Sequence, residues 1–156
     1  LAGWVCGAGP ARDVAKARGK VGATYRRDGD ARVPVSVADG PAVYASANAE
    51  ELARVLANRA DNAVRNASAK VIHAVGVEGG RAVLTVADDG PGIPAKERER
   101  VFERFARLDD ARDRDAGGTG LGLAIVRELL RRSDGSISLQ DNPDGPGLVA
   151  VIHLAR

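Results

Sequence analysis

Apolar residues recur at three- and four-residue spacing from Asn48 onward, in the pattern of one face of a helix. The positions are Leu52, Val55, Leu56, Ala60, Ala63, Val64 and Ala67. Asn48 is placed to cap the first turn. The same spacing returns from Leu121 to Arg132, and shorter helices are predicted near Ala95 to Val101 and near Ala11 to Ala17.

Runs rich in valine or with alternating apolar residues predict the strands. These runs are residues 33–37, 42–45, 71–77, 81–87, 136–140 and 148–154. Asp39-Gly40-Pro41 separates the first two, and Glu78-Gly79-Gly80 separates the third and fourth, so the pattern predicts two hairpins. Together the elements predict an α+β fold, a two-layer α/β sandwich with about three helices on one face of a mixed, mostly antiparallel sheet.

Composition narrows the class of protein. A chain of 156 residues fits one domain, in which we assign residues 46–156 to the main body and residues 1–45 to a weakly patterned N-terminal segment. A net charge of +2 and 3% aromatic residues give no field or stacking surface for nucleic acid. No apolar run approaches the roughly 20 residues of a membrane span. With a single cysteine and no such run, we expect the chain to be cytoplasmic. We also expect it to be a piece of a longer protein, since methionine is absent throughout.

Polar residues follow one edge of the long predicted helix. Asn58 and Asn62 stand four residues apart and Arg65 three further on, so their side chains can converge on one ligand. An amide carbonyl oxygen is a ligand that Mg²⁺ accepts, and an arginine can face phosphate. An ordinary solvated helix face is the alternative.

The segment DDGPGI, residues 88–93, follows a valine-rich strand. Asp88 would present a carboxylate that can accept from the amino group of adenine, while Gly90 and Gly92 let the backbone turn beside a flat ligand. The same residues are also common in a plain turn.

A second glycine segment, GGTGLGL at residues 117–123, leads into the helix predicted from Leu121. No Lys-Ser/Thr pair follows, and no starting point fits G-x-G-x-x-G, which excludes both common phosphate loops. Backbone N–H groups at the positive end of the helix dipole predict an anion site, such as one for phosphate groups. A flexible hinge is the alternative reading. The charged stretch before it, residues 102–118, is expected to be a mobile loop, either a lid whose Arg107 or Arg112 reaches the γ-phosphate or a solvated loop.

The helix with Asn58 and Asn62 and the two glycine segments are joined by a phenylalanine-centred box, VFERFARL at residues 101–108. In their order and spacing, these four segments resemble the ATP-binding catalytic domain of bacterial sensor histidine kinases. The superfamily also holds gyrase, Hsp90, MutL and anti-sigma-factor kinases, and the resemblance runs from about Asn48 to Leu154. It implies a Bergerat-type fold with ATP and Mg²⁺ as cofactors, Asn62 as the metal ligand, and Asn58 and Arg65 as catalytic residues. The nucleotide-binding residues that it implies are Asn62, Arg65, Asn66, Asp88, Gly90, Gly92, Ile93, Phe102, Arg107, Gly118, Thr119, Gly120, Leu121, Gly122 and Leu123.

Asn58 occupies the position where gyrase-like ATPases and anti-sigma-factor kinases carry a glutamate base. An attacking imidazole needs no such base, so the resemblance favours phosphoryl transfer to histidine. His73 and His153 lie in predicted strands without the family's acceptor motif, which places the acceptor on a separate dimerisation domain of the same parent protein. A response regulator would then receive the phosphoryl group. The fragment would be a monomer and its parent a homodimer that could be membrane-anchored.

Three other functions stay open at this point: a non-catalytic nucleotide-sensing or docking module, a serine kinase of the anti-sigma-factor type, and a gyrase- or Hsp90-like clamp. Several residues depart from the family pattern, among them Leu148, which stands where threonine is frequent. Arg59 replaces a usual leucine on the apolar stripe, where a guanidinium would be costly unless it snorkels or is paired, and Asn66 replaces a usual histidine or tyrosine.

Overall fold

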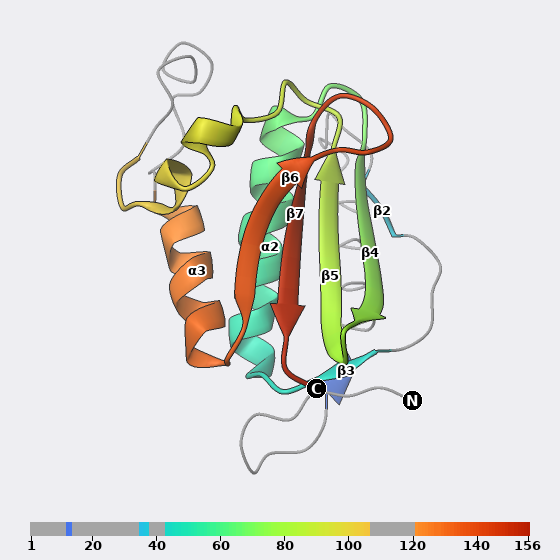
Figure 1. The fold of residues 1–156 in the computed structure, drawn as a ribbon, viewed down its shortest axis with the longest axis vertical. Helices are drawn as coiled ribbons and strands as arrows, with labels where there is room; N and C mark the ends of the chain where they lie inside the picture. The colour runs from blue at the N-terminus through green and yellow to red at the C-terminus, as the bar shows by residue number, and fades with distance from the viewer. Residues whose placement is uncertain (1–11, 14–34, 38–42, 107–120) are drawn as a thin grey trace.

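The computed structural model describes residues 12–13, 35–37, 43–106 and 121–156. Five strands form one sheet in the order β2-β4-β5-β7-β6 (Figure 1). The strands are β2 (Val35–Val37), β4 (Val71–Glu78), β5 (Arg81–Asp88), β6 (Ser136–Asp141) and β7 (Leu148–Leu154). Every pairing is antiparallel except that of β2 with β4. A separate antiparallel pair joins β1 (Arg12–Asp13) to β3 (Tyr44–Ala45).

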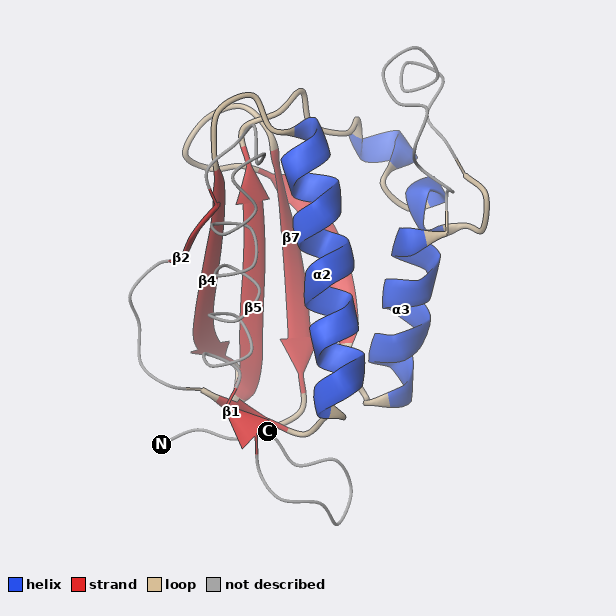
Figure 2. Cartoon of the chain, turned by 180° about the vertical axis from the view of Figure 1, so that it is seen from behind, coloured by secondary structure: helices blue, strands red, loops and turns tan. Residues whose placement is uncertain are grey.

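Two helices, α2 (Ala49–Asn66) and α3 (Gly122–Arg132), cover the same face of the sheet (Figure 2). The side chain of Asn48 accepts hydrogen bonds from the N–H groups of Glu50 and Glu51, which confirms it as the N-cap of α2. Two short 3₁₀ turns, η1 (Ala95–Glu97) and η2 (Arg100–Phe102), precede the gap before α3. The α+β class with a mixed, mostly antiparallel sheet is therefore confirmed. No helix in the described part of the chain has the length and apolar character to cross a bilayer.

The core lies between the helices and the sheet in two clusters. One joins α2 and α3 to the middle of the sheet through Leu56, Leu84 and Ile152. The other lies at the C-terminal end of α2, where Val71, Val86 and Phe102 pack together. Burial of side chains of this size contributes about 1.5–3 kcal/mol each. The second cluster supports the end of the molecule that carries the predicted site.

The hairpin predicted around Glu78-Gly79-Gly80 is confirmed. Gly79 and Gly80 have φ of +54° and +76°, as a tight two-residue connection between β4 and β5 requires. The hairpin predicted from residues 33–37 and 42–45 is wrong. β2 instead pairs in parallel with β4, so that Val35 lies opposite Val71. Alternation identified both runs as strands, but a strand's partner is fixed by the edge that it can complete.

Two predicted short helices also differ. Arg12–Asp13 is a strand where a helix was expected near residues 11–17, because this pair is recruited as the partner of β3. The rest of that stretch lies outside the described residues. Residues 95–101 do coil, but as two separate 3₁₀ turns of three residues each. The division of the chain at residue 46 stays a prediction.

Candidate functional site

The predicted site segments meet at one end of the molecule, the upper end in Figure 1. β5 ends there at Asp88, α2 ends there at Asn66, and α3 begins on the same side. The turn between β6 and β7 closes this end, because the side chain of Asn142 donates a hydrogen bond to the Asp88 carbonyl at 3.1 Å. Four segments far apart in the sequence therefore surround one location.

Asp88 provides a buried carboxylate at this location. The residue is only 5% exposed, and its Oδ1 accepts a hydrogen bond from the Gly90 N–H at 3.0 Å. Burial raises the pKa of the carboxyl, while the Gly90 N–H, the Arg59 guanidinium and the Leu148 backbone each act to lower it. An oriented carboxylate with little water around it is suited to accept a hydrogen bond from an amino group of a ligand.

Glycines allow the backbone to approach Asp88 from both sides. A Cβ on Gly90 would lie 2.1 Å from the Asn66 carbonyl oxygen, and one on Gly147 would lie 2.0 Å from the carbonyl oxygen of Asp88. Gly92 and Gly147 also have φ of +73° and +111°, which side chains rarely adopt. We call Asp88, Gly90, Gly92 and Gly147 the Asp88 floor, because backbone contacts fix its shape.

The polar residues of α2 form the second part of the candidate site, which we call the asparagine face: Asn58, Asn62, Arg65 and Asn66. Asn58 and Asn62 are half-buried, and the other two are exposed. The amide Nδ2 of Asn58 donates to the Arg54 carbonyl at 2.9 Å, and that of Asn66 donates to the Asn62 carbonyl at 2.7 Å. With one N–H of each amide used in this way, the amide oxygen and the second N–H are the groups that can meet other partners.

The start of α3 lies against the asparagine face. A Cβ on Gly122 would be 3.1 Å from Oδ1 of Asn58, so the glycine allows the two helices to approach closely. The residue before the helix, Leu121, makes no capping side-chain hydrogen bond, and Leu121, Gly122 and Leu123 are half-buried. Among the described residues, no side chain caps the first backbone N–H groups of α3, which are the kind of groups that bind anions at a helix start. Five other predicted residues lie outside the described part of the chain, as does most of the predicted lid: Arg107, Arg112, Gly118, Thr119 and Gly120.

Phe102 and Ile93 both pack in the cluster beneath the site, Phe102 buried and Ile93 half-buried. The Arg127 guanidinium lies 5.2 Å from the centre of the Phe102 ring, and its Nη2 donates to the Phe102 carbonyl at 3.4 Å. Phe102 therefore joins η2 to α3. Phe105, the second phenylalanine of the segment at residues 101–108, is 72% exposed and does not share this role.

The sequence did not reveal how much of the site depends on Asp89 and Asn142. Oδ1 of Asp89 accepts hydrogen bonds from the backbone N–H groups of Ser68, Ala69 and Lys70, at 2.9, 3.0 and 3.2 Å. These bonds hold the α2–β4 loop to the end of β5, and they lower the pKa of Asp89. An Asp directly after a strand was the available signal, but nothing in the sequence indicated the distant loop as its partner.

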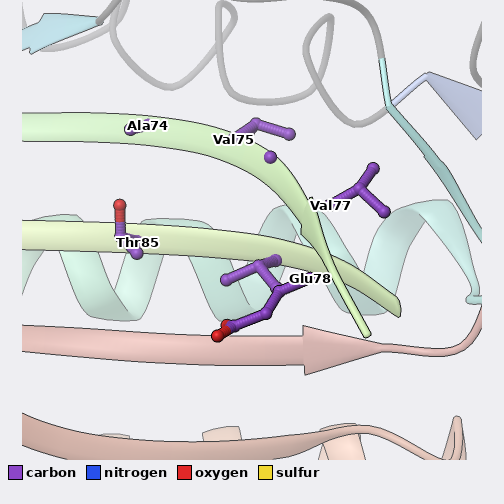
Figure 3. A pocket seen from close by; sticks show the side chains of 7 residues that line it. Ala74, Val75, Val77, Glu78 and Thr85 are labelled. Atoms are coloured by element: carbon purple, nitrogen blue, oxygen red, sulfur yellow. The ribbon is translucent and has the colours of Figure 1, made fainter. Parts of the chain in front are cut away.

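One further feature lies away from the site segments. A hollow of about 290 Å³ lies at the opposite end of β4 and β5, where valine and alanine side chains with Glu78 and Thr85 line it (Figure 3). It brings none of the predicted site residues together.

Within the described residues, no three His, Cys, Asp or Glu side chains gather as a metal site. A metal ion at the candidate site would therefore depend on amide oxygen and on ligands carried by a nucleotide.

Comparison with known proteins agrees with this arrangement. Residues 47–156 match the family described as histidine kinase-, DNA gyrase B-, and HSP90-like ATPase. The sensor histidine kinase CpxA of Escherichia coli K12 is 43% identical over 112 residues, which are 72% of this chain and 24% of CpxA. The solved structure of the mycobacterial sensor histidine kinase MprB is 30% identical with a TM-score of 0.72, and the match covers 91% of this chain and 93% of that one.

A further solved structure, full-length ShkA in complex with AMPPNP, is 28% identical with a TM-score of 0.72 over 91% of this chain and 30% of that one. The chain thus spans about a quarter of the length of CpxA and most of the solved MprB chain. The family match covers most of the chain and contains every predicted site residue. The chain therefore belongs to the histidine kinase-, DNA gyrase B-, and HSP90-like ATPase family, and within it matches the ATP-binding catalytic domain of sensor histidine kinases.

Proposed function

We propose that this domain binds Mg²⁺-ATP between the Asp88 floor and the asparagine face, and donates the γ-phosphoryl group to a histidine on another domain of its parent protein. The convergence of α2, the end of β5 and the start of α3 at one end of the sheet is the observation that carries this proposal. AMPPNP in the complex with the relative ShkA supports ATP as the ligand.

Adenine would lie on the Asp88 floor. The Asp88 carboxylate would accept from the exocyclic amino group, and the glycine backbone would leave room for the flat ring. Ile93 and Phe102 would supply apolar contact from the cluster below. Because the floor is held by backbone contacts, it would need little rearrangement on binding.

The asparagine face and the start of α3 would hold the phosphates. Asn62 would offer its amide oxygen to Mg²⁺, which usually keeps several waters and substrate phosphate oxygens in its shell, so one protein ligand fits this site. When bound, the ion would neutralise charge on the phosphates. Arg65, Asn66 and the N–H groups at Gly122 and Leu123 would face phosphate oxygens. The roles of Arg107, Gly118, Thr119 and Gly120 stay predictions.

In the chemical step, an imidazole nitrogen forms a bond to the γ-phosphorus while the bond from that phosphorus to the β–γ bridging oxygen breaks. ADP leaves with the bridging oxygen, and the imidazole N–H proton passes to solvent. Asn58 has no basic group, and an imidazole needs none, whereas an attacking water would. His73 is fully buried, so the acceptor would be supplied by the separate dimerisation domain. The response regulator would take the group from it.

The test is a labelling experiment with the full-length parent protein and γ-labelled ATP in Mg²⁺. We expect label that is lost in acid and stable in base, as for phosphohistidine, and a strong reduction in the Asn62→Ala variant. Label that survives acid and is lost in base would indicate a serine kinase instead. Steady ATP hydrolysis by the isolated chain would indicate a clamp-type ATPase, and nucleotide binding without any label would indicate a docking module.

A further inference from the structure

A buried arginine lies beneath the proposed base site. Arg59 is on the sheet-facing side of α2 and only 1% exposed, so it does not snorkel to the surface. The resemblance to sensor histidine kinases gives leucine as the usual residue there, so an apolar side chain can fill this part of the core. Burial lowers the pKa of Arg59 to about 10, which leaves the guanidinium charged at neutral pH.

The fold places Arg59 and Asp88 on facing sides of the same core layer. Side chains alternate along β5, so Asp88 lies on the same face as Leu84 and Val86, which pack against the helices. Val71 is the register partner of Asp88 and packs with Ala63, one helical turn after Arg59. Arg59 and Asp88 therefore occupy the same layer, between α2 and the end of the β4–β5 pair.

Asp88 is also the compensating charge for Arg59. Nε and Nη1 of Arg59 are buried and make no hydrogen bond with the described residues. An isolated buried guanidinium would be costly, so its charge requires a neighbour of opposite sign. The Asp88 carboxylate is the buried acidic group in the same layer as Arg59 among the described residues. In agreement with this placement, the attraction between the two groups acts to raise the pKa of Arg59 and to lower that of Asp88, in each case against the effect of burial.

We propose that Arg59 is a positioning residue for base recognition, whose charge holds the buried Asp88 carboxylate in the form that accepts a hydrogen bond from adenine. Arg59 does not touch the nucleotide in this account. The inference deepens the proposed function and rests on it. It assigns a role to a residue that would otherwise be an unfavourable replacement in an apolar core.

Other groups also face Asp88. Among the described residues, the buried His73 lies on the neighbouring strand, Asp89 follows in the chain, and the backbones of Gly90 and Leu148 approach the carboxylate. Two of them, His73 and Asp89, have ionisable side chains that could also change nucleotide binding with pH. A test must therefore observe Asp88 itself, in addition to the affinity for nucleotide.

The first experiment is a carboxyl-carbon NMR titration of Asp88 in the nucleotide-free chain, compared between wild type, Arg59→Leu and Arg59→Lys. We expect the midpoint for Asp88 to rise by about one pH unit in Arg59→Leu, because an opposite charge lowers such a pKa by about one to three units. Arg59→Lys keeps the charge, so its midpoint should stay near that of the wild type. Equal midpoints in wild type and Arg59→Leu would overturn the inference.

The second experiment titrates the same three proteins with AMPPNP and Mg²⁺ between pH 5.5 and 8.5. The acid limb of binding should move to higher pH in Arg59→Leu by the same interval as the Asp88 midpoint. A loss of affinity that is equal at every pH would mean a merely structural role and would overturn the inference. Absence of AMPPNP binding by the folded wild type would overturn the proposed function, whatever the Asp88 midpoint shows.

If Arg59→Leu does not fold, the stability of Arg59→Met, Asp88→Asn and the double variant decides the matter. We expect Asp88→Asn to restore stability to Arg59→Met, since the unpaired buried carboxylate is then removed. Additive effects of the two substitutions would show that the side chains are independent, and would overturn the inference.

Discussion

The Asp88 floor and the asparagine face would bind the same nucleotide, but they are held in place differently. The floor consists of a buried carboxylate and glycines whose backbones lie against Asn66 and Asp88 themselves. The asparagine face consists of half-buried or exposed side chains on an already complete helix. Folding therefore fixes the floor, while the face can lose a side chain with little effect on the fold. Substitutions in the two regions should separate stability from binding.

The largest effect is expected from Gly147→Ala. A Cβ at this position would lie 2.0 Å from the Asp88 carbonyl oxygen, and the φ of +111° is itself unfavourable for alanine. We expect the free energy of unfolding to fall by about 3 kcal/mol or more, measured by urea denaturation. Gly76→Ala is the matched control, because a Cβ there meets nothing within 4 Å, and it should change stability by less than about 1 kcal/mol. Similar losses in both variants would mean that the floor is not held by these contacts.

Asp88→Asn should affect binding instead of folding. The amide oxygen can still accept from the Gly90 N–H, but the charge that would bind the adenine amino group is lost, so affinity for an ATP analogue should fall about 100-fold. The effect on stability should depend on pH. Burial raises the pKa of Asp88, so in the wild type ionisation of this group lowers stability as pH rises through its folded pKa.

In Asp88→Asn this dependence of stability on pH should be absent. Urea denaturation of the variant and the wild type at several pH values would measure the difference. If Asp88→Asn binds the analogue as tightly as the wild type does, the floor is not the base site.

Asn62→Ala tests the asparagine face. The side chain is half-buried on a helix, so we expect the free energy of unfolding to change by less than about 1 kcal/mol. The increase in analogue affinity that Mg²⁺ produces should fall about tenfold, as for the loss of one polar ligand. Arg54→Ala, at an exposed position two turns earlier, is the control and should bind as the wild type does. Equal effects of the two substitutions would count against Asn62 as the metal ligand.

The smallest effect is expected at Asp89, which holds the α2–β4 loop. Asp89→Ala removes the acceptor of three backbone N–H groups and should lower Tm modestly, whereas Asp89→Asn keeps an oxygen and should lower it less. The lowered pKa of Asp89 means that its contribution is present above its unfolded pKa and is lost as pH falls through its folded pKa. Thermal melting at neutral and at strongly acidic pH would measure this. A difference between wild type and alanine variant that persists at the acidic end would contradict it.

The sequence predicted those elements whose signal is local. Helix spacing with the Asn48 cap located α2, and Glu78-Gly79-Gly80 located the hairpin of β4 and β5, because each signal lies within the element that it describes. The partner of β2 was not predictable in this way. Val35 pairs with Val71, and only the assembled sheet brings these residues together.

The candidate site also has parts that the sequence indicated and parts that only the structure revealed. The family motifs indicated Asn58, Asn62 and Asp88. The structure places Asn58 against Gly122 at the start of α3, and it places the turn after Asp88 against the end of α2 at Asn66. The proximity of Arg59 to Asp88 and the closure of the floor by Asn142 and Gly147 arise between segments that are distant in the sequence. Arg59 was visible in the sequence only as a charge on an apolar stripe. The structure was needed to identify the carboxylate that balances it.

The central claim is that one nucleotide spans the Asp88 floor and the asparagine face. Calorimetric titration of the chain with a non-hydrolysable ATP analogue, with and without Mg²⁺, in wild type, Asp88→Asn and Asn62→Ala tests it most directly. The account predicts Mg²⁺-dependent binding by the wild type, loss of most affinity in Asp88→Asn with or without the ion, and loss of only the Mg²⁺-dependent part in Asn62→Ala. Absence of binding by the folded wild type, or binding that neither substitution changes, would contradict it.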